Sequence, residues 1–413
     1  MNKRRVVVTG LGVVAPNGIG KEEFWRANVE GKSGISHVND FDVGRYGSKV
    51  YGKVNGFDCS LKLPSEIYKR VDRFVHLGLI AAKMAIEDSG LNLKAEDRSR
   101  IGVIYGSGLG GVLFHEEQML KGYEKGTHRL NPLCVPRITP NAVGAHIAIY
   151  FNILGPNLVI SNACASGNGA IGEAFRKIQH GEIDVAISGG AEAPLTEFTF
   201  GAYDALGVLA KNFDPSQASC PFDRRRDGFV LAEGSAGLLL EDLDHALSRN
   251  ANIYAEIVGY ALNSGAYNMV IPKPDAEDVC RAMTAALRDA GIGPESIDYI
   301  NAHGTSTVHN DRVETKAIKI LFGDYAKKIP ISSTKSMIGH SIGAAGAIEA
   351  VVGCLAIHEQ FIPPTVNYQE KDSECDLDWV QGQGRSAKLN NVLSNSFGFG
   401  SNNACVVLRK YCG

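Results

Sequence analysis

One cysteine stands in a setting that suits nucleophilic chemistry. Cys164 follows an apolar segment at residues 158–161 and precedes a run rich in glycine and alanine. A thiol at the N-terminus of a helix feels the positive end of the helix dipole, which favours the reactive thiolate. A buried cysteine is also a common small core residue. The segment taken alone therefore leaves both interpretations open.

Two histidines lie in loops that suit the same site. His303 ends an apolar segment and is followed by glycine and three hydroxyl residues at 304–307, a pattern that suits a polar ligand. His340 ends a hydroxyl-rich segment that also contains Lys335. Each histidine taken alone is more readily explained as structural. Lys335 is expected to be partly buried beside a partner, and Glu349 in the following apolar helix is the natural candidate.

A glycine-rich turn near the C-terminus offers two further functions. Residues 394–403 alternate aromatic residues with glycine, and Phe399 stands between Gly398 and Gly400. Backbone N–H groups in such a turn can form an oxyanion site, and a ring between two glycines can move as a gate. A packed strand and turn explains the pattern equally well.

The elements that position these residues alternate between strand and helix. Strands are predicted at 6–9, 101–105, 158–161 and 185–188, and a second set at 254–260, 299–301, 331–333 and 404–408. Helices are predicted at 80–88, 276–290 and 342–357. This alternation indicates an α/β fold with parallel layers. The best boundary between the two sets lies near residue 251.

Composition excludes several classes of function. The chain has 413 residues, a net charge of −3 and no basic stripe, so nucleic acid is an unlikely partner. Nine scattered cysteines fit reduced thiols in a cytoplasmic protein. The apolar stretch after the basic N-terminus is too short for a signal peptide. The segment 342–357 is interrupted by Glu349 and is expected to be a buried helix and not a membrane span.

The four motifs together resemble the β-ketoacyl-acyl-carrier-protein synthases, closest to the synthase II type. The resemblance extends from residues 7–10 to the final predicted strand. It implies the thiolase fold, an α/β architecture of two pseudo-dyad-related halves in five alternating helix and sheet layers. The halves are expected at 1–251, which bears the nucleophile, and at 252–413, which bears both histidines. The family further implies a homodimer that works with an acyl carrier protein.

The resemblance also implies roles for single residues. Cys164 matches the acylated nucleophile, and His303 and His340 match the two histidines of decarboxylation. Lys335 and Glu349 match the buried pair beside them. The implied reaction is a decarboxylative condensation of an acyl group with malonyl-carrier. A thiolase differs in having a second cysteine as its acid–base group, and no such cysteine motif replaces His340 in this chain.

Substrate contacts follow from the same resemblance. Phe399 matches the gating aromatic residue, and its N–H with that of Cys164 matches the oxyanion hole. Thr305 and Thr307 match the hydroxyls that hold the phosphopantetheine arm. Further substrate contacts are expected at Phe200, Leu109 and Phe397.

A cofactor is not expected, apart from a structural monovalent cation near Asn301, Glu349 and Asn395. The acidic carrier is expected to dock on positive charge at Lys69, Arg70 and Arg73. A solvated charged face explains this cluster equally well.

Several positions depart from the family's common pattern. Asp, His and Thr are usual where this chain has Gly265, Asn268 and Val270. Ile338 replaces a usual Thr and Ser401 a usual Gly, while Asp204 stands where a basic or neutral residue is common; these six departures spare the proposed chemistry. They leave a type II polyketide or aryl-polyene-like pathway, with a dedicated carrier or hetero-partner, as the alternative to fatty-acid elongation.

Two other classes of function are alternatives to an active synthase. A non-catalytic chain-length factor usually lacks the nucleophile, which Cys164 and both histidines argue against. A Cys–His hydrolase needs an acid that orients its histidine, and no orienting acid is evident in the sequence.

Overall fold

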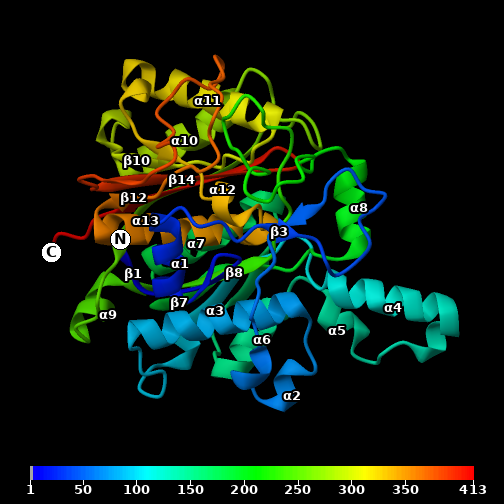
Figure 1. The fold of residues 1–413 in the computed structure, drawn as a ribbon. Helices are drawn as coiled ribbons and strands as arrows, with labels where there is room; N and C mark the ends of the chain where they lie inside the picture. Colours follow the sequence, from blue (N-terminus) through cyan, green and yellow to red (C-terminus); the bar gives the residue numbers. More distant parts are fainter. Residues whose placement is uncertain (1–2) are drawn as a thin grey trace.

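The computed structural model describes residues 3–413, and its main sheet is one continuous path of strands. The order is β11-β10-β14-β15-β9-β1-β8-β7-β5-β6, and the short β2 pairs with β1 (Figure 1). The strands of the N-terminal half are β1 Val6–Ala15, β2 Gly18–Ile19, β5 Ile101–Gly106, β6 Asn157–Ile160, β7 Val185–Glu192 and β8 Gly234–Asp242. Those of the C-terminal half are β9 Ala255–Ser264, β10 Tyr299–Asn301, β11 Ile331–Ser332, β14 Asn391–Gly398 and β15 Asn402–Arg409.

The two halves of this path repeat each other. From the centre outward, the first half runs β1-β8-β7-β5-β6 and the second runs β9-β15-β14-β10-β11. In both halves the first two neighbouring pairs are antiparallel and the last two are parallel. The halves join where β1 pairs with β9. Element order was only a weak sign of this repeat in the sequence, whereas strand direction shows it directly.

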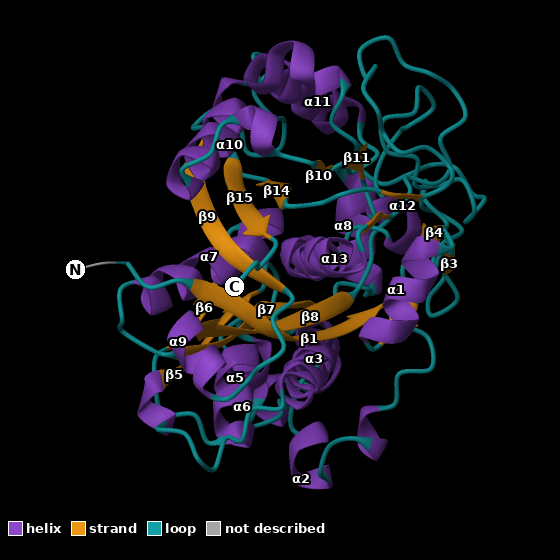
Figure 2. Cartoon of the chain, turned by 90° about the vertical axis from the view of Figure 1, so that its left-hand side faces the viewer, coloured by secondary structure: helices purple, strands orange, loops and turns teal. Residues whose placement is uncertain are grey.

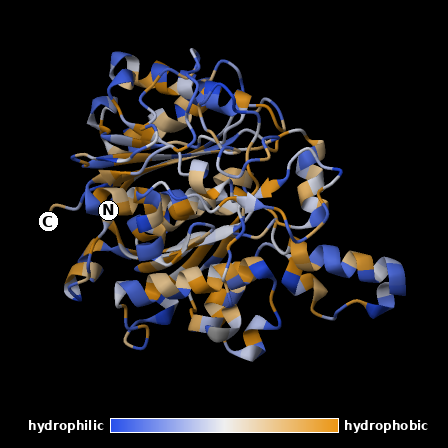
Figure 3. Cartoon of the chain, in the orientation of Figure 1, coloured by the Kyte–Doolittle hydropathy of each residue, from blue (hydrophilic) through white to orange (hydrophobic). Residues whose placement is uncertain are grey.

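Figure 2 shows five layers of helix and sheet. Helix α3 (Arg73–Ser89) covers the outer face of the first half-sheet, and α10 (Glu277–Ala290) covers that of the second. Between the half-sheets lie α7 (Ser166–Gln179) and α13 (Ala345–Glu359). Apolar residues gather on the strands and these central helices (Figure 3). The predicted thiolase-type α/β architecture is thus confirmed, while the boundary at 251/252 stays a prediction that falls in the connection between α9 and β9.

The central position of α13 explains its apolar sequence. Among the described residues, the segment Ile342–Glu359 is the one helical stretch long and apolar enough to cross a membrane by length and composition alone. It is 89% buried inside the fold. A helix packed between two sheets has no polar face, so composition alone does not separate it from a span.

The remaining elements surround the two halves. The other helices are α1 Lys21–Val29, α2 Ser65–Tyr68, α4 Val112–Lys125, α5 Cys134–Ile138, α6 Ala142–Phe151, α8 Glu197–Ala205, α9 Leu243–Ser248, α11 Val308–Phe322 and α12 Lys335–Ile338. Two short sheets pair β3 Ser36–His37 with β4 Val50–Tyr51 and β12 Phe361–Ile362 with β13 Arg385–Ser386. The sequence did not predict α4, α6, α8 or α11, and α4 and α5 project from the body (Figure 1).

Candidate active site

The nucleophile turn connects β6 to α7. Cys164 lies in the single 3₁₀ turn Ala163–Ala165, directly before α7. Ala163 has a positive φ of 49°, a conformation that costs energy in a residue other than glycine. The equivalent turn before α13 begins at Ile342, whose φ is 44°. The pseudo-dyad thus places two strained turns, from the two halves, against each other.

Both predicted histidines face this turn. His340 Nε2 lies 3.0 Å from Cys164 Sγ. The rings of His303 and His340 meet edge to face, with their centroids 5.3 Å apart. All three side chains are buried, and their ligand-type atoms lie within 4.8 Å of one another. The structure therefore brings the Cys–His–His trio together from both halves of the chain.

Burial controls protonation in this trio. It raises the pKa of the Cys164 thiol to about 12, although the charge of Lys335 and the N–H of Phe399 lower it. The direction is opposite to that expected from the helix dipole alone, so the resting sulfur is a thiol. Burial and the charge of Lys335 hold the pKa of both His303 and His340 well below 6.5. Both imidazoles are therefore neutral near pH 7.

Lys335 and Glu349 form the expected buried pair. The ammonium donates to Glu349 Oε1, and both side chains are 1% exposed. Lys335 Nζ also lies 3.4 Å from His303 Nδ1. If the ammonium donates to Nδ1, His303 carries its own proton on Nε2, where it can serve as a donor.

Comparison with known proteins agrees with this geometry. Residues 3–246 match the beta-ketoacyl synthase N-terminal domain, and residues 254–369 match the C-terminal domain. The chain belongs to the β-ketoacyl synthase family. Two relatives named 3-oxoacyl-[acyl-carrier-protein] synthase 2 are each 43% identical: that of Coxiella burnetii over 99% of both chains, and that of Synechocystis over 100% of this chain and 99% of the relative.

Solved structures give the same family. A type II polyketide ketosynthase, solved with its acyl-carrier protein, has a TM-score of 0.92 at 37% identity and covers 99% of this chain and 100% of that one. A β-ketoacyl synthase from Burkholderia phymatum has a TM-score of 0.92 at 33% identity with the same coverage. The family assignment makes this chain a condensing acyltransferase.

The Lys335–Glu349 pair of this synthase gives a stability prediction. Changing Lys335→Met leaves the Glu349 carboxylate buried without its partner, which should destabilise the fold by about 3–5 kcal/mol. Changing Lys335→Met together with Glu349→Leu removes both charges and should recover most of that loss. Denaturant unfolding of the wild type and the two variants gives their free energies of unfolding. Equal destabilisation of both variants would contradict the pairing.

Two carboxylates that the sequence reasoning missed hold the His303 loop. Glu314 accepts the backbone N–H groups of His303 at 2.9 Å and Gly304 at 2.8 Å. Asp311 accepts the N–H of Thr305 at 3.0 Å. Both acids lie on α11, which starts directly after the loop, so their three-residue spacing puts them on one helix face. That spacing was a signal available in the sequence.

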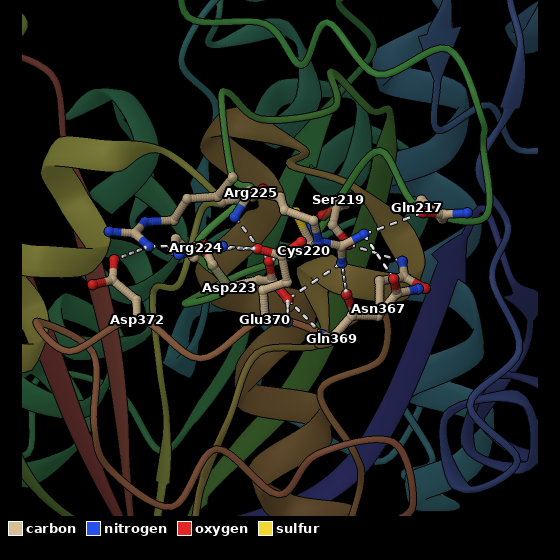
Figure 4. Close-up of polar contacts among 12 residues, drawn as sticks. Gln217, Ser219, Cys220, Asp223, Arg224, Arg225, Asn367, Gln369, Glu370 and Asp372 are labelled. Atoms are coloured by element: carbon tan, nitrogen blue, oxygen red, sulfur yellow. Dashed lines mark hydrogen bonds and ion pairs between the residues drawn. The ribbon is translucent and has the colours of Figure 1, made fainter.

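A polar network covers this loop from outside. Figure 4 shows Arg225 between Asp223, Gln217 and Gln369, which joins the 217–226 and 367–372 segments. Phe222, next to Asp223, donates its N–H to Asp311 at 2.8 Å. The network therefore fixes the same acid that holds the catalytic loop.

Glu192 is a third missed carboxylate. It ends β7 and accepts the N–H groups of Gly108 at 2.6 Å, Leu109 at 3.0 Å and Gly343 at 2.9 Å. Burial raises the pKa of Glu192 to about 7. Its contacts tie the loop after β5 to the turn that follows His340.

The trio opens into a pocket that contains further predicted residues. Thr305, Thr307, Phe397 and Phe399 line it together with Cys164. The hydroxyls of Thr305 and Thr307 lie 2.8 Å apart. The expected arm-binding hydroxyls are thus on the wall of the catalytic pocket.

Phe399 separates this pocket from a second one. The second pocket is an apolar groove between α4 and α8, and Leu109 and Phe399 line it. Phe200 lines neither pocket; it is fully buried behind the site and packs edge to face against Phe41 and Tyr46. Its predicted direct contact with substrate therefore does not appear in this arrangement.

Buried oxygens without partners lie where the sequence predicted a cation. Among the described residues, Asn301 Oδ1, Glu349 Oε2 and Asn395 Oδ1 accept no hydrogen bond. The amide of Asn395 donates instead to Glu314 at 3.2 Å. Hard oxygen donors of this kind fit a hard cation, so the residues present fit the implied ion.

The predicted docking cluster divides into two parts. Lys69 and Arg70 are exposed, as docking requires. Arg73 instead donates through Nε and Nη2 to the buried Glu233, both at 2.6 Å, which commits its guanidinium inside the fold. The prediction for Arg73 is corrected accordingly. Asp204 accepts the N–H groups of Gly47 and Ser48 at 3.0 Å and so anchors a loop.

Proposed function

We propose that the chain catalyses the decarboxylative Claisen condensation of an acyl group with malonyl-acyl carrier protein in fatty-acid elongation. The observation that carries this function is the Cys164 thiol 3.0 Å from a neutral His340, with His303 facing both in one buried pocket. The relatives at 43% identity are named for the same synthase activity.

The first half of the reaction loads the nucleophile. Cys164 Sγ attacks the thioester carbonyl while its proton passes to His340 Nε2. The N–H groups of Cys164 and Phe399 hold the resulting oxyanion. The carrier thiolate leaves and takes the proton from His340, so that the products are acyl-Cys164 and carrier thiol.

The second half forms the carbon–carbon bond. The malonyl thioester loses CO₂, and the electrons of the broken bond form an enolate on the thioester oxygen. For this step the proton of neutral His340 exchanges through solvent from Nδ1 to Nε2, the nitrogen that accepted the thiol proton in the first half. The neutral imidazoles of His303 and His340 then stabilise the enolate oxygen by donating N–H, each donor contributing about 3 kcal/mol. The enolate carbon attacks acyl-Cys164, the thioester bond breaks, and a proton from solvent restores the thiol.

The two competing functions fit the site less well. His340 Nδ1 has no partner among residues 3–413, so no acid orients this imidazole as a hydrolase would require. A chain-length factor would not need the complete trio. Intact-mass analysis with acyl-carrier alone distinguishes the three: a synthase gives stable acyl-enzyme, a hydrolase gives free acid, and a factor remains unmodified.

The polyketide alternative rests on the solved structures. A ketosynthase with a chain-length factor, the ishigamide complex, has a TM-score of 0.93 at 33% identity. Such a pathway would supply a dedicated carrier or a hetero-partner. The fatty-acid function is favoured because relatives at 40–43% identity are named 3-oxoacyl-[acyl-carrier-protein] synthase 2, whereas the polyketide ketosynthases are 33–37% identical. Comparing condensation rates with the two kinds of carrier distinguishes the pathways.

The position of Phe399 supports a gating role. Because its side chain lies between the catalytic pocket and the apolar groove, a rotation would join the two spaces. The groove walls are apolar and include Leu109 and Met119, which suits an acyl chain. Asn301, Glu349 and Asn395 would hold a structural monovalent cation behind the trio, where it would neutralise buried carboxylate charge.

The exposed edge of the sheet at β6 is best explained as the contact with a second copy of the chain. β6 ends the sheet, and Leu158 on it is exposed beside Ile149 and Leu154. Unpaired strand edges with apolar neighbours favour pairing with another strand. A homodimer through β6 is therefore proposed, and light scattering should give a mass of two chains. The nine cysteines carry no disulfide, which supports the proposed cytoplasmic location.

The proposed docking of the carrier on Lys69 and Arg70 can be tested by reversing their charge. Changing Lys69→Glu with Arg70→Glu should raise KM for acyl-carrier by about 10-fold, because rim charges act on the encounter rate. Turnover of a small acyl-pantetheine thioester should hardly change. The defect should shrink at high salt, since exposed charges are screened.

The matched control changes the exposed pair Lys327→Glu with Lys328→Glu, which alters net charge equally in the other half. An equal loss of activity with the carrier-bound and the small substrate would contradict docking at Lys69 and Arg70. An equal rise in KM for acyl-carrier in the control variant would contradict it as well.

A further inference from the structure

A carboxylate enters the catalytic pocket from an unexpected position. Asp278 lies in the first turn of α10, is 3% exposed, and lines the pocket that contains Cys164. None of the roles described so far uses this residue. Buried carboxylates are rare unless they are paired or functional, so Asp278 needs an explanation.

The carboxylate fills the space of a missing side chain. A Cβ at Gly265 would lie 2.1 Å from Asp278 Oδ2, which is closer than any real contact. Glycine at position 265 therefore leaves the space that the Asp278 carboxylate occupies beside the pocket.

Only one of the two carboxylate oxygens is satisfied. Oδ2 accepts a hydrogen bond from Asn403 Nδ2 at 3.0 Å, and Asn403 also binds Asn263 Oδ1 at 3.0 Å. Oδ1 has no partner among the described residues. A buried carboxylate oxygen without a donor is costly, and such atoms persist where a ligand or water supplies the missing hydrogen bond.

The loop after β9 is hydrogen-bonded to the turn that carries Phe399. Gly265 donates its N–H to the carbonyl of Ser401 at 2.8 Å, and Gly400 donates to Met269 at 2.8 Å. Ser401 Oγ also donates to the carbonyl of Asn268 at 3.2 Å. The segment 265–269 is thus tied to the turn that carries Phe399, and both Phe399 and Asp278 line the catalytic pocket.

The chemistry of the pocket indicates what Oδ1 binds. An ionised carboxylate only accepts hydrogen bonds, and it repels a phosphate. The pantetheine part of a carrier's arm contains two amide N–H groups between the phosphate and the thioester. We propose that Asp278 is a specificity-determining residue whose Oδ1 accepts a hydrogen bond from an amide N–H of the incoming arm. This inference rests on the proposed function, which supplies the thioester arm.

The test removes the acceptor without disturbing the anchor. In Asp278→Asn the amide oxygen can still accept from Asn403, while its NH₂ group replaces the acceptor that faces the arm. Acylation of Cys164 is measured with the same acyl group on pantetheine, on N-acetylcysteamine and on ethanethiol. The expected result is a KM raised roughly 10-fold for pantetheine and unchanged for ethanethiol, which has no amide.

The N-acetylcysteamine thioester reports which amide is bound, since it keeps only the amide nearest the sulfur. Glu277→Gln is the matched control, because it removes the same charge from the adjacent and largely exposed residue. An equal effect of Asp278→Asn on all three thioesters, or no effect on any, would overturn the inference and make Asp278 a structural anchor. Failure of the wild-type chain to form acyl-enzyme from any thioester would instead overturn the proposed function.

A reciprocal exchange tests the position of the carboxylate. Gly265→Asp alone should destabilise the fold, because its Cβ overlaps Asp278 Oδ2. Asp278→Gly alone should lose the preference for the pantetheine arm. The double variant should regain both stability and preference, and a double variant as defective as the worse single variant would contradict the exchange.

Discussion

Replacing Cys164→Ala should abolish acyl transfer and condensation while the protein stays folded. The side chain is small and buried, so alanine removes the sulfur without introducing a larger group. Acyl-enzyme would be absent from intact-mass spectra after incubation with acyl-carrier, and no β-ketoacyl product would form from malonyl-carrier. Thermal unfolding serves as the control for folding. Condensation at the wild-type rate would exclude Cys164 as nucleophile.

Cys164→Gln should separate the two halves of the reaction. The glutamine amide resembles an acylated side chain, and its carbonyl can occupy the place of the acyl oxygen beside the Phe399 N–H. Acyl transfer should be lost, while decarboxylation of malonyl-carrier should continue or increase. The rate of CO₂ release measures the decarboxylation. Loss of this partial reaction would count against the proposed role of the histidines.

The sequence predicted the trio better than it predicted the supports of the trio. Cys164, His303 and His340 stand in distinct short motifs whose spacing matches one family, and the structure brings them together. Glu314 accepts from a loop 11 residues away, and its three-residue spacing from Asp311 was the one local signal that was missed. Glu192 carries no motif, because it accepts backbone N–H groups from loops that are distant in the chain. Such contacts depend on tertiary placement, which local pattern does not report.

Some secondary-structure elements were likewise predicted from the sequence and others were not. Strands such as β10 and β5 were predicted closely, since buried parallel strands are continuous β-branched and apolar runs. Helices α4 and α8 were missed because their outer faces carry exposed apolar residues, including Met119 and Phe198, which obscure the usual amphipathic pattern. Arg73 was misassigned because its partner Glu233 is distant in sequence.

The state of the thiol was also beyond sequence reasoning. A helix N-terminus after Cys164 argues for a thiolate, yet burial raises the pKa of that thiol to about 12. The two effects oppose each other, and only the structure shows that the thiol is buried deeply enough for desolvation to dominate. Proton transfer to His340 during attack then becomes part of the mechanism.

The histidine variants should fail at decarboxylation more than at acylation. His303→Ala and His340→Ala each remove one N–H donor to the enolate oxygen, so decarboxylation of malonyl-carrier should fall by roughly 10²–10³-fold. His303→Ala should accept an acyl group nearly as well as the wild type, because His303 does not contact the sulfur. His340→Ala should acylate more slowly, since Nε2 lies 3.0 Å from Sγ. Wild-type decarboxylation by either variant would make that histidine structural.

The pH profile provides the sharper test of the same two residues. Both pKa values lie well below 6.5 because burial and Lys335 disfavour the imidazolium, so the neutral donors persist as the pH falls through 6.5. The decarboxylation rate of Cys164→Gln, which has no thiol to titrate, should therefore show no loss from imidazole protonation as the pH falls through 6.5. Burial raises the pKa of Glu192, Glu314 and Glu349 to about 7, so these carboxyls account for any step near that pH. The unfolded chain binds protons on these histidines near pH 6.5 and the folded chain does not, so their contribution to stability is complete above that pH and declines below it. NMR signals of the two imidazoles that shift with an apparent pKa near 6.5 would show that they titrate normally, and the neutral-donor mechanism would be wrong.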